Sequence, residues 1–185
     1  MKRLFYIVVA LLSLFAVNSC KDKRQASVIS SNDSLQVEET ADTTIYGVCG
    51  EGTSMHSLEF LADSGDSLSV LIDDGDSCIV QGGLLSGDRI ALICYKDADG
   101  EYVAQHVINL TSLLGKWTSI DKNFEILEGG EVKNNVKVET NPWTSWKILN
   151  GKLLLNTDTF SISKLGPDSL LLENKTGIFV FKRQG

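Results

Sequence analysis

WKILNGKLLL, residues 146–155, is the stretch that decides the fold, because it carries the strongest short-range turn signal in the chain. Its two apolar runs are separated by Asn150-Gly151, a pair that favours the two-residue turn in which both central residues have positive φ. Such a turn joins antiparallel neighbours. The stretch therefore predicts a β-hairpin with strands over 146–149 and 152–155.

Short apolar runs closed by Gly, Asp, Asn or Ser continue on both sides of this hairpin. The alternation at 160–163 and 179–182 places aromatic rings on one face of a half-buried sheet. Many short strands with polar turns predict an all-β fold of the antiparallel barrel or sandwich class, with at most one or two helical turns at 107–114. The other predicted strands are 44–49, 57–61, 67–72, 79–84, 89–95, 102–109, 116–120, 124–127, 132–138, 160–165, 169–172 and 178–182.

The part of the chain from residue 45 onward is long enough for one ordinary domain or two small ones. We divide it near residues 110–112, which gives one β-domain over 45–110 and a second over 111–185. The run GGLLSGDRI at 82–90 indicates a small OB-like barrel for the first. One continuous barrel or sandwich built by both halves stays open as the alternative.

The second half contains Leu114-Gly115-Lys116-Trp117, the 146–153 strand pair, the 160–162 strand and a closing strand that ends in Arg183. In this order the elements resemble the lipocalin-like domains of lipoproteins from the Bacteroidetes, over roughly residues 113–184. The resemblance implies that Trp117 packs across the closed end of a barrel with Arg183 against it, a contact of about 0.5–2 kcal/mol. The region is half the length of a full lipocalin. The question of whether its barrel contains a ligand-sized lumen therefore stays open.

The N-terminus has the pattern of an exported precursor. Lys2 and Arg3 precede an apolar run at 4–17 that is shorter than the about 20 residues needed to span a bilayer, which is typical of a signal peptide over 1–19. The following Val17-Asn18-Ser19-Cys20 resembles the lipobox of bacterial lipoproteins, and this resemblance implies lipidation of Cys20 and attachment to a membrane. Residues 20–44 are polar and lack aromatic residues, which predicts a disordered tether after the lipidated cysteine.

Charge and cysteine content narrow the location and the partners. The formal net charge of −7 argues against nucleic-acid binding, which depends on basic residues. The mostly basic KDKR at 21–24 favours an outer-membrane lipoprotein that faces the periplasm, with the cell surface as the alternative. Cys49, Cys78 and Cys94 allow at most one disulfide and fit no metal motif, so we expect small buried side chains and neither metal nor cofactor.

The densest aromatic spot is at Trp143 and Trp146. Residues three apart on a strand face opposite sides, so one indole should enter the core while the other lines a pocket mouth. We predict Trp143, Trp146 and Phe160 as contacts for a small apolar ligand or a glycan. Packing within the core is the alternative.

Nothing in the sequence marks a catalytic centre. Asp97-x-Asp99-Gly100 fails the EF-hand register and predicts a turn. An enzyme would need residues distant in sequence, such as His106 with Glu51 or Asp88. The sequence therefore predicts a non-catalytic, membrane-anchored module that binds a small apolar ligand or an envelope protein; a structural or assembly accessory without a pocket is the alternative.

Overall fold

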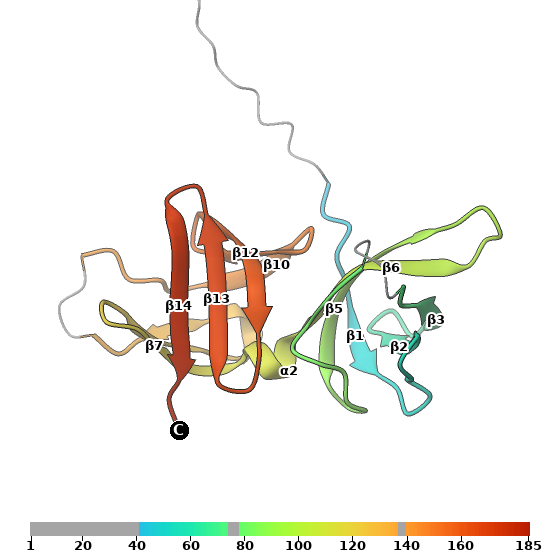
Figure 1. Ribbon diagram of the computed structural model, residues 1–185, viewed down its shortest axis with the longest axis horizontal. Helices are drawn as coiled ribbons and strands as arrows, with labels where there is room; N and C mark the ends of the chain where they lie inside the picture. Colours follow the sequence, from blue (N-terminus) through green and yellow to red (C-terminus); the bar gives the residue numbers. More distant parts are fainter. Residues whose placement is uncertain (1–40, 74–77, 137–139) are drawn as a thin grey trace, which may run out of the picture. The chain divides into compact units, whose positions relative to one another are not determined.

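The computed structural model describes residues 41–73, 78–136 and 140–185. These residues form two β-sheets that follow each other along the chain, which confirms the predicted all-β barrel class (Figure 1). The predicted signal peptide at 1–19, the lipidated Cys20 and the tether up to residue 40 lie outside the described residues.

The first sheet, sheet A, closes into a five-stranded barrel. Its strand order is β3-β2-β1-β5-β6, and a parallel pairing of β3 with β6 closes the ring through Val70 opposite Tyr102. A barrel of five strands that is closed by this parallel β3–β6 pair confirms the OB-like prediction for the first half. The five strands of the barrel are β1 (Ile45–Cys49), β2 (Ser57–Ala62), β3 (Ser67–Leu71), β5 (Arg89–Lys96) and β6 (Tyr102–Asn109), and the sixth strand of sheet A, β4 (Ile79–Gln81), pairs in parallel with β6.

The second sheet, sheet B, is an up-and-down barrel of eight antiparallel strands. From β7 to β9 and from β10 to β14 each strand pairs with the next along the chain, and β14 pairs with β7, so the barrel is nearly closed. Between β9 and β10 the barrel is joined by a single bridge from Glu131 to Ser145. Its strands are β7 (Gly115–Thr118), β8 (Asn123–Ile126), β9 (Val132–Asn134), β10 (Trp146–Leu149), β11 (Lys152–Leu155), β12 (Asp158–Leu165), β13 (Ser169–Asn174) and β14 (Gly177–Arg183).

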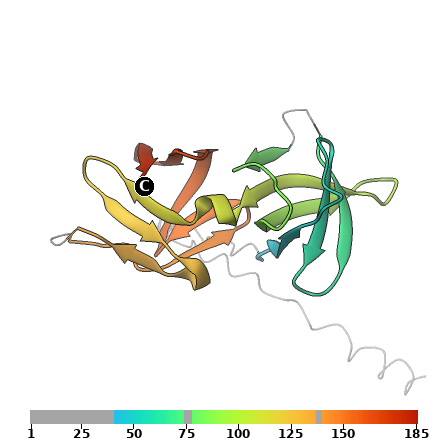
Figure 2. The ribbon, with the colours of Figure 1, turned by 90° about the horizontal axis from the view of Figure 1, so that it is seen from below.

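Because each half of the folded region builds its own barrel, the alternative of one barrel shared by both halves is wrong. The curvature of the two sheets is visible in Figure 2. Their cores are nevertheless linked, since Ala91 and Ile108 of sheet A belong to the same buried cluster as the apolar residues of sheet B. Independent folding of 45–110 and 111–185 stays a prediction.

The hairpin predicted at 146–155 is confirmed in type and register. Leu149 pairs with Lys152, which leaves Asn150 and Gly151 as a two-residue turn with φ of 48° and 75°. Both values are positive, as this turn requires.

Two strands are shorter than predicted. The strand expected at 79–84 ends at Gln81, because the two glycines that follow have φ of 92° and 74° and leave the extended conformation. The strand expected at 132–138 is described only to Asn134, whose side chain accepts a hydrogen bond from the amide of Val136 at 2.8 Å and turns the chain.

A single helical turn, α2 (Leu110–Leu113), connects the sheets at the predicted junction (Figure 1). Asn109 caps its first turn by accepting a hydrogen bond from the amide of Ser112 at 2.8 Å. The same side chain donates to the carbonyl of Gly83 and to the carboxylate of Asp88. Asn109 is 1% exposed, so these bonds fix the junction from within.

The end of the predicted tether is ordered. Residues 41–44 lie against the tip of the β10–β11 hairpin, where Asn150 accepts hydrogen bonds from Thr43 and donates to the carbonyl of Ala41. The amide of Asn150 donates to the hydroxyl of Thr44 at 2.9 Å. The tether prediction is therefore wrong for 41–44, because a hairpin tip distant in sequence binds them.

Candidate functional site

Aromatic rings pack the interior of the sheet B barrel. Trp143 and Phe160 are 6% and 2% exposed and meet edge to face, with ring centroids 5.7 Å apart. The indole N–H of Trp143 donates to the carboxylate of Asp158, and the ammonium of Lys122 lies 4.2 Å from the ring centre. The remaining rings in contact with this pair are Phe124, Phe179 and Phe181.

Trp143 and Phe160 are therefore core residues, and the prediction that they contact a ligand is not supported. Both side chains are buried and contact other rings edge to face, so neither presents an open surface to a ligand. The reason for burial also differs from the expectation, because Trp143 precedes β10 and does not lie on a strand. An eight-stranded barrel is just wide enough for side chains to fill it.

Trp117 and Arg183 face each other on β7 and β14, the first and last strands of this barrel. The guanidinium of Arg183 lies 4.2 Å from the centre of the fully buried Trp117 ring. It also donates to the carbonyls of Ser112 and Leu114, while the indole N–H donates to the carbonyl of Leu113. These contacts join the end of α2 to β7 and β14, the first and last strands of sheet B.

Trp146 lies in a different environment, at a pocket of about 310 Å³. Its ring is partly buried and packs against the core, whereas Trp143 lies inside the core. The pocket combines residues of both sheets with the helical turn between them. Its other lining residues are Arg89, Leu110, Leu114, Glu128 and Gly129.

The turn between β8 and β9 contacts both the side chain and the backbone of Trp146. The indole N–H donates to the carbonyl of Leu127 at 2.7 Å, which satisfies the only polar group of the ring. Gly130 has a φ of 86°, and a side chain there would lie 3.1 Å from the carbonyl of Trp146. Two glycines in the short 3-10 turn η2 (Glu128–Gly130) thus let the backbone pass close to β10 and place Glu128 at the pocket.

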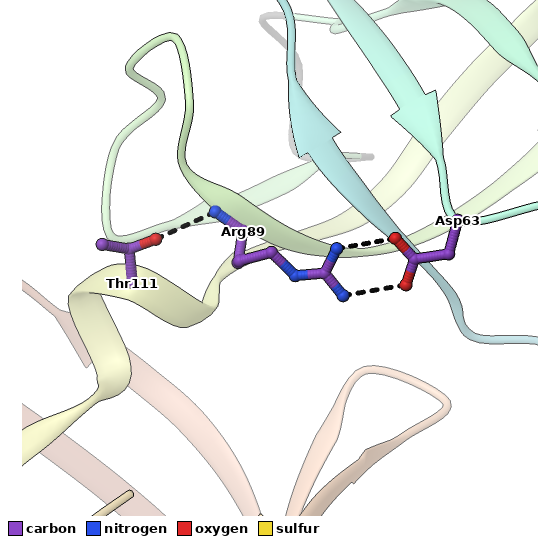
Figure 3. Close-up of polar contacts among 3 residues, drawn as sticks. All are labelled: Asp63, Arg89 and Thr111. Carbon is purple, nitrogen blue, oxygen red and sulfur yellow. Dashed lines mark hydrogen bonds and ion pairs between the residues drawn. The ribbon is translucent and has the colours of Figure 1, made fainter. Parts of the chain in front are cut away.

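Arg89, at the start of β5, is held on two sides. Its guanidinium donates to both carboxylate oxygens of Asp63 at 2.6 and 2.8 Å, as Figure 3 shows. Its backbone N–H donates to the hydroxyl of Thr111 on α2 at 2.9 Å. The bidentate pair raises the pKa of Arg89 and lowers the pKa of Asp63, so both groups stay charged and compensate each other.

Leu110 and Leu114 provide the apolar part of the pocket together with Trp146. The amide of Leu114 donates to the carbonyl of Leu110 at 3.0 Å, so the two side chains are one helical turn apart on the same face. Asn109 caps this turn through the amide of Ser112.

Glu128 differs from the other charged groups of the pocket. Its side chain is exposed, and within the described residues its carboxylate makes no hydrogen bond and no ion pair. The pocket therefore offers an apolar wall, one compensated ion pair and one uncompensated negative charge.

A larger hollow of about 750 Å³ lies on sheet A. At this hollow Tyr46 donates to the carbonyl of Ile148, Asp66 accepts from Ser64, and the ammonium of Lys96 lies 4.8 Å from the Tyr102 ring centre. We favour the smaller pocket, because it combines a tryptophan wall with a charge that no residue satisfies.

The other groups singled out in the sequence do not assemble into a catalytic set. Among the described residues, no hydrogen bond or ion pair joins His106 to Glu51 or Asp88; Asp88 instead accepts from Asn109 and from the amide of Leu85. Burial, and then the charge of Lys152, lowers the pKa of His106.

The three cysteines of the described region are free thiols, and Cys49 is buried. Burial raises the pKa of Cys78 and of Cys94, so these two thiols stay protonated at neutral pH.

Asp97 accepts hydrogen bonds from the amides of Asp99 and Glu101, which confirms the predicted turn. Residues 41–73, 78–136 and 140–185 contain no group of three or more His, Cys, Asp or Glu arranged to hold a metal ion. In the same ranges no helix is both long and apolar enough to cross a membrane.

Comparison of the chain with models of protein families, with curated proteins and with solved structures finds no match in any of the three.

Proposed function

We propose that this chain is a non-catalytic, lipid-anchored binding module of the bacterial cell envelope, and that the Trp146 pocket holds a small ligand with an apolar body. The observation that carries the ligand site is the partly buried Trp146 beside Leu110 and Leu114 in a pocket of about 310 Å³. This volume is at the lower end of small-molecule sites, which favours a ligand of a few carbon atoms.

The anchor is supported by the sequence alone. The apolar run at 4–17 and the lipobox-like segment that ends at Cys20 are typical of a bacterial lipoprotein, and the mostly basic KDKR at 21–24 favours the periplasmic face of the outer membrane. Mass spectrometry of the native protein tests it: we expect a chain that begins at residue 20 and carries fatty acids, and a Cys20→Ser variant without them. Retention of residues 1–19 or a bare thiol would contradict the anchor.

Tryptophan emission of the full chain tests the ligand site. We expect at least one of three six-carbon compounds (1-hexanol, hexylammonium or hexanoate) to shift the emission with saturation. The shift should survive in Trp143→Phe, whose indole lies in the core, and disappear in Trp146→Phe. No binding of any of the three would contradict the proposed site.

A protein partner is the second candidate, and the outer face of β14 favours it. Ile178 and Val180 are 64% and 55% exposed, and they line a hollow together with the fully exposed Ile120. Apolar residues gathered in this way are typical of protein contacts. A photo-crosslinker at Val180 in intact envelopes should capture an envelope protein, whereas one at Lys182, on the same strand, should capture it less.

A further inference from the structure

We propose that the ligand of the Trp146 pocket is a small organic cation, an ammonium group carried by an apolar chain or ring. The inference rests on the proposed function, because it names the ligand class of the same site. It follows from the charges around the pocket and from the chemistry that the Trp146 ring has left to offer.

The charges at the pocket leave one negative group uncompensated. Arg89 and Glu128 line the pocket, and Asp63 binds Arg89 through both carboxylate oxygens. Since the charges of Asp63 and Arg89 cancel, the carboxylate of Glu128 makes the net charge at the pocket negative. A ligand with a positive charge would pair with Glu128 without breaking any bond that the structure contains.

The ring of Trp146 also favours a ligand with a positive charge. Its indole N–H is bound to the carbonyl of Leu127, so the ring has no hydrogen-bond donor for a ligand and presents only apolar carbon and π surface. The face of an indole carries negative potential and attracts ammonium groups more strongly than the other aromatic side chains do. Leu110 and Leu114 then contact the apolar part of the ligand.

An anion is disfavoured on three grounds. Near Arg89 it would meet the negative carboxylate of Asp63, which already neutralises the guanidinium through bonds of 2.6 and 2.8 Å. It would also lie close to Glu128. The chain as a whole has a formal net charge of −7, and such a field raises the local concentration of cations and lowers that of anions.

Hexylammonium, 1-hexanol and hexanoate share one apolar chain and differ in the charge of a small head group, so their dissociation constants test the proposal. At pH 7 and low ionic strength we expect hexylammonium to bind the full chain about fivefold or more tighter than 1-hexanol, with hexanoate weakest. The preference should shrink when the ionic strength rises from about 0.01 M to about 0.15 M.

Two variants make the test specific. Glu128→Gln keeps the shape of the side chain and should reduce hexylammonium affinity to that of 1-hexanol. Glu101→Gln removes the same charge from the β5–β6 turn and should leave the preference unchanged. If the compounds bind the wild type equally, or if Glu128→Gln keeps the preference, the cation proposal is overturned while the binding function stands. If none of the three binds, both proposals are overturned.

Discussion

The guanidinium of Arg183 lies 4.2 Å from the centre of the Trp117 ring and bonds to the carbonyls on either side of Leu113. One side chain at the end of β14 therefore joins the last strand of sheet B to its first strand and to α2. Lysine carries the same charge but has no planar fork, so it cannot make these contacts together.

We expect Arg183→Lys to lower the free energy of unfolding by about 1–3 kcal/mol, because it leaves carbonyls at the end of α2 without their donor. Urea denaturation followed by tryptophan emission measures the change. Lys182→Ala, at an exposed position of the same strand, serves as the control and should change the free energy by less than about 0.5 kcal/mol. A similar loss in both variants would contradict the role of Arg183.

Gly115 and Gly129 give a matched pair of substitutions. Both have positive φ, of 119° and 77°, but a Cβ at Gly115 would lie 2.7 Å from a guanidinium nitrogen of Arg183, while one at Gly129 would meet nothing within 4 Å. We expect Gly129→Ala to lower the free energy of unfolding by about 1–2 kcal/mol and Gly115→Ala to lower it further. The comparison requires only denaturation midpoints, and equal losses would argue against the close approach of Arg183.

Asn109→Ala should be among the most destabilising polar substitutions. It removes the cap of α2, leaves the carbonyl of Gly83 without its side-chain donor and removes one of the two donors to the carboxylate of Asp88. We expect a loss of about 2–4 kcal/mol in unfolding free energy. Gln105→Ala, exposed on the same strand, is the control. A loss of below about 1 kcal/mol for Asn109→Ala would show that the junction does not depend on this residue.

Stability should fall on mild acidification because of His106. Its folded-state pKa lies below the ordinary value of 6.5, through burial first and the charge of Lys152 second. The unfolded state then binds a proton more readily than the folded state, so the contribution is full above pH 6.5 and is lost as the pH falls through 6.5 toward the lowered value.

Denaturation at pH 7.5 and at pH 5.5 measures this effect. His106→Gln should lose less stability between the two conditions than the wild type does. An unchanged pH dependence in His106→Gln would mean that another group titrates in this range.

The strand pattern was predictable wherever local turn chemistry fixes it. Asn150-Gly151 defined its hairpin to the residue, because the turn type and the register depend only on neighbours in sequence. The strand expected at 79–84 ended early because Gly82 and Gly83 adopt positive φ, and the side-chain amide of Gln81 bonds to the backbone of Ile162 and Leu165 on β12. A contact between residues so far apart in the sequence leaves no signal in the sequence around Gln81.

The site was predictable only in part. Trp146 was identified through its aromatic surroundings, but Trp143 and Phe160 were assigned to the same pocket although they pack on each other. Arg89 and Glu128 were missed, because the pocket joins the start of β5, the junction and the β8–β9 turn. The only sequence signal for Glu128 is the pair of glycines that follows it, and glycine pairs occur in many turns.

The hydrogen bonds between Asn150 and residues 41–44 also have a mechanical consequence. A force applied to the chain from its N-terminal side reaches the tip of the β10–β11 hairpin before it reaches the ladder between β1 and β5. Under such a load the hydrogen bonds that hold residues 41–44 to the hairpin tip would therefore break first, before the load reaches the pairs between β1 and β5.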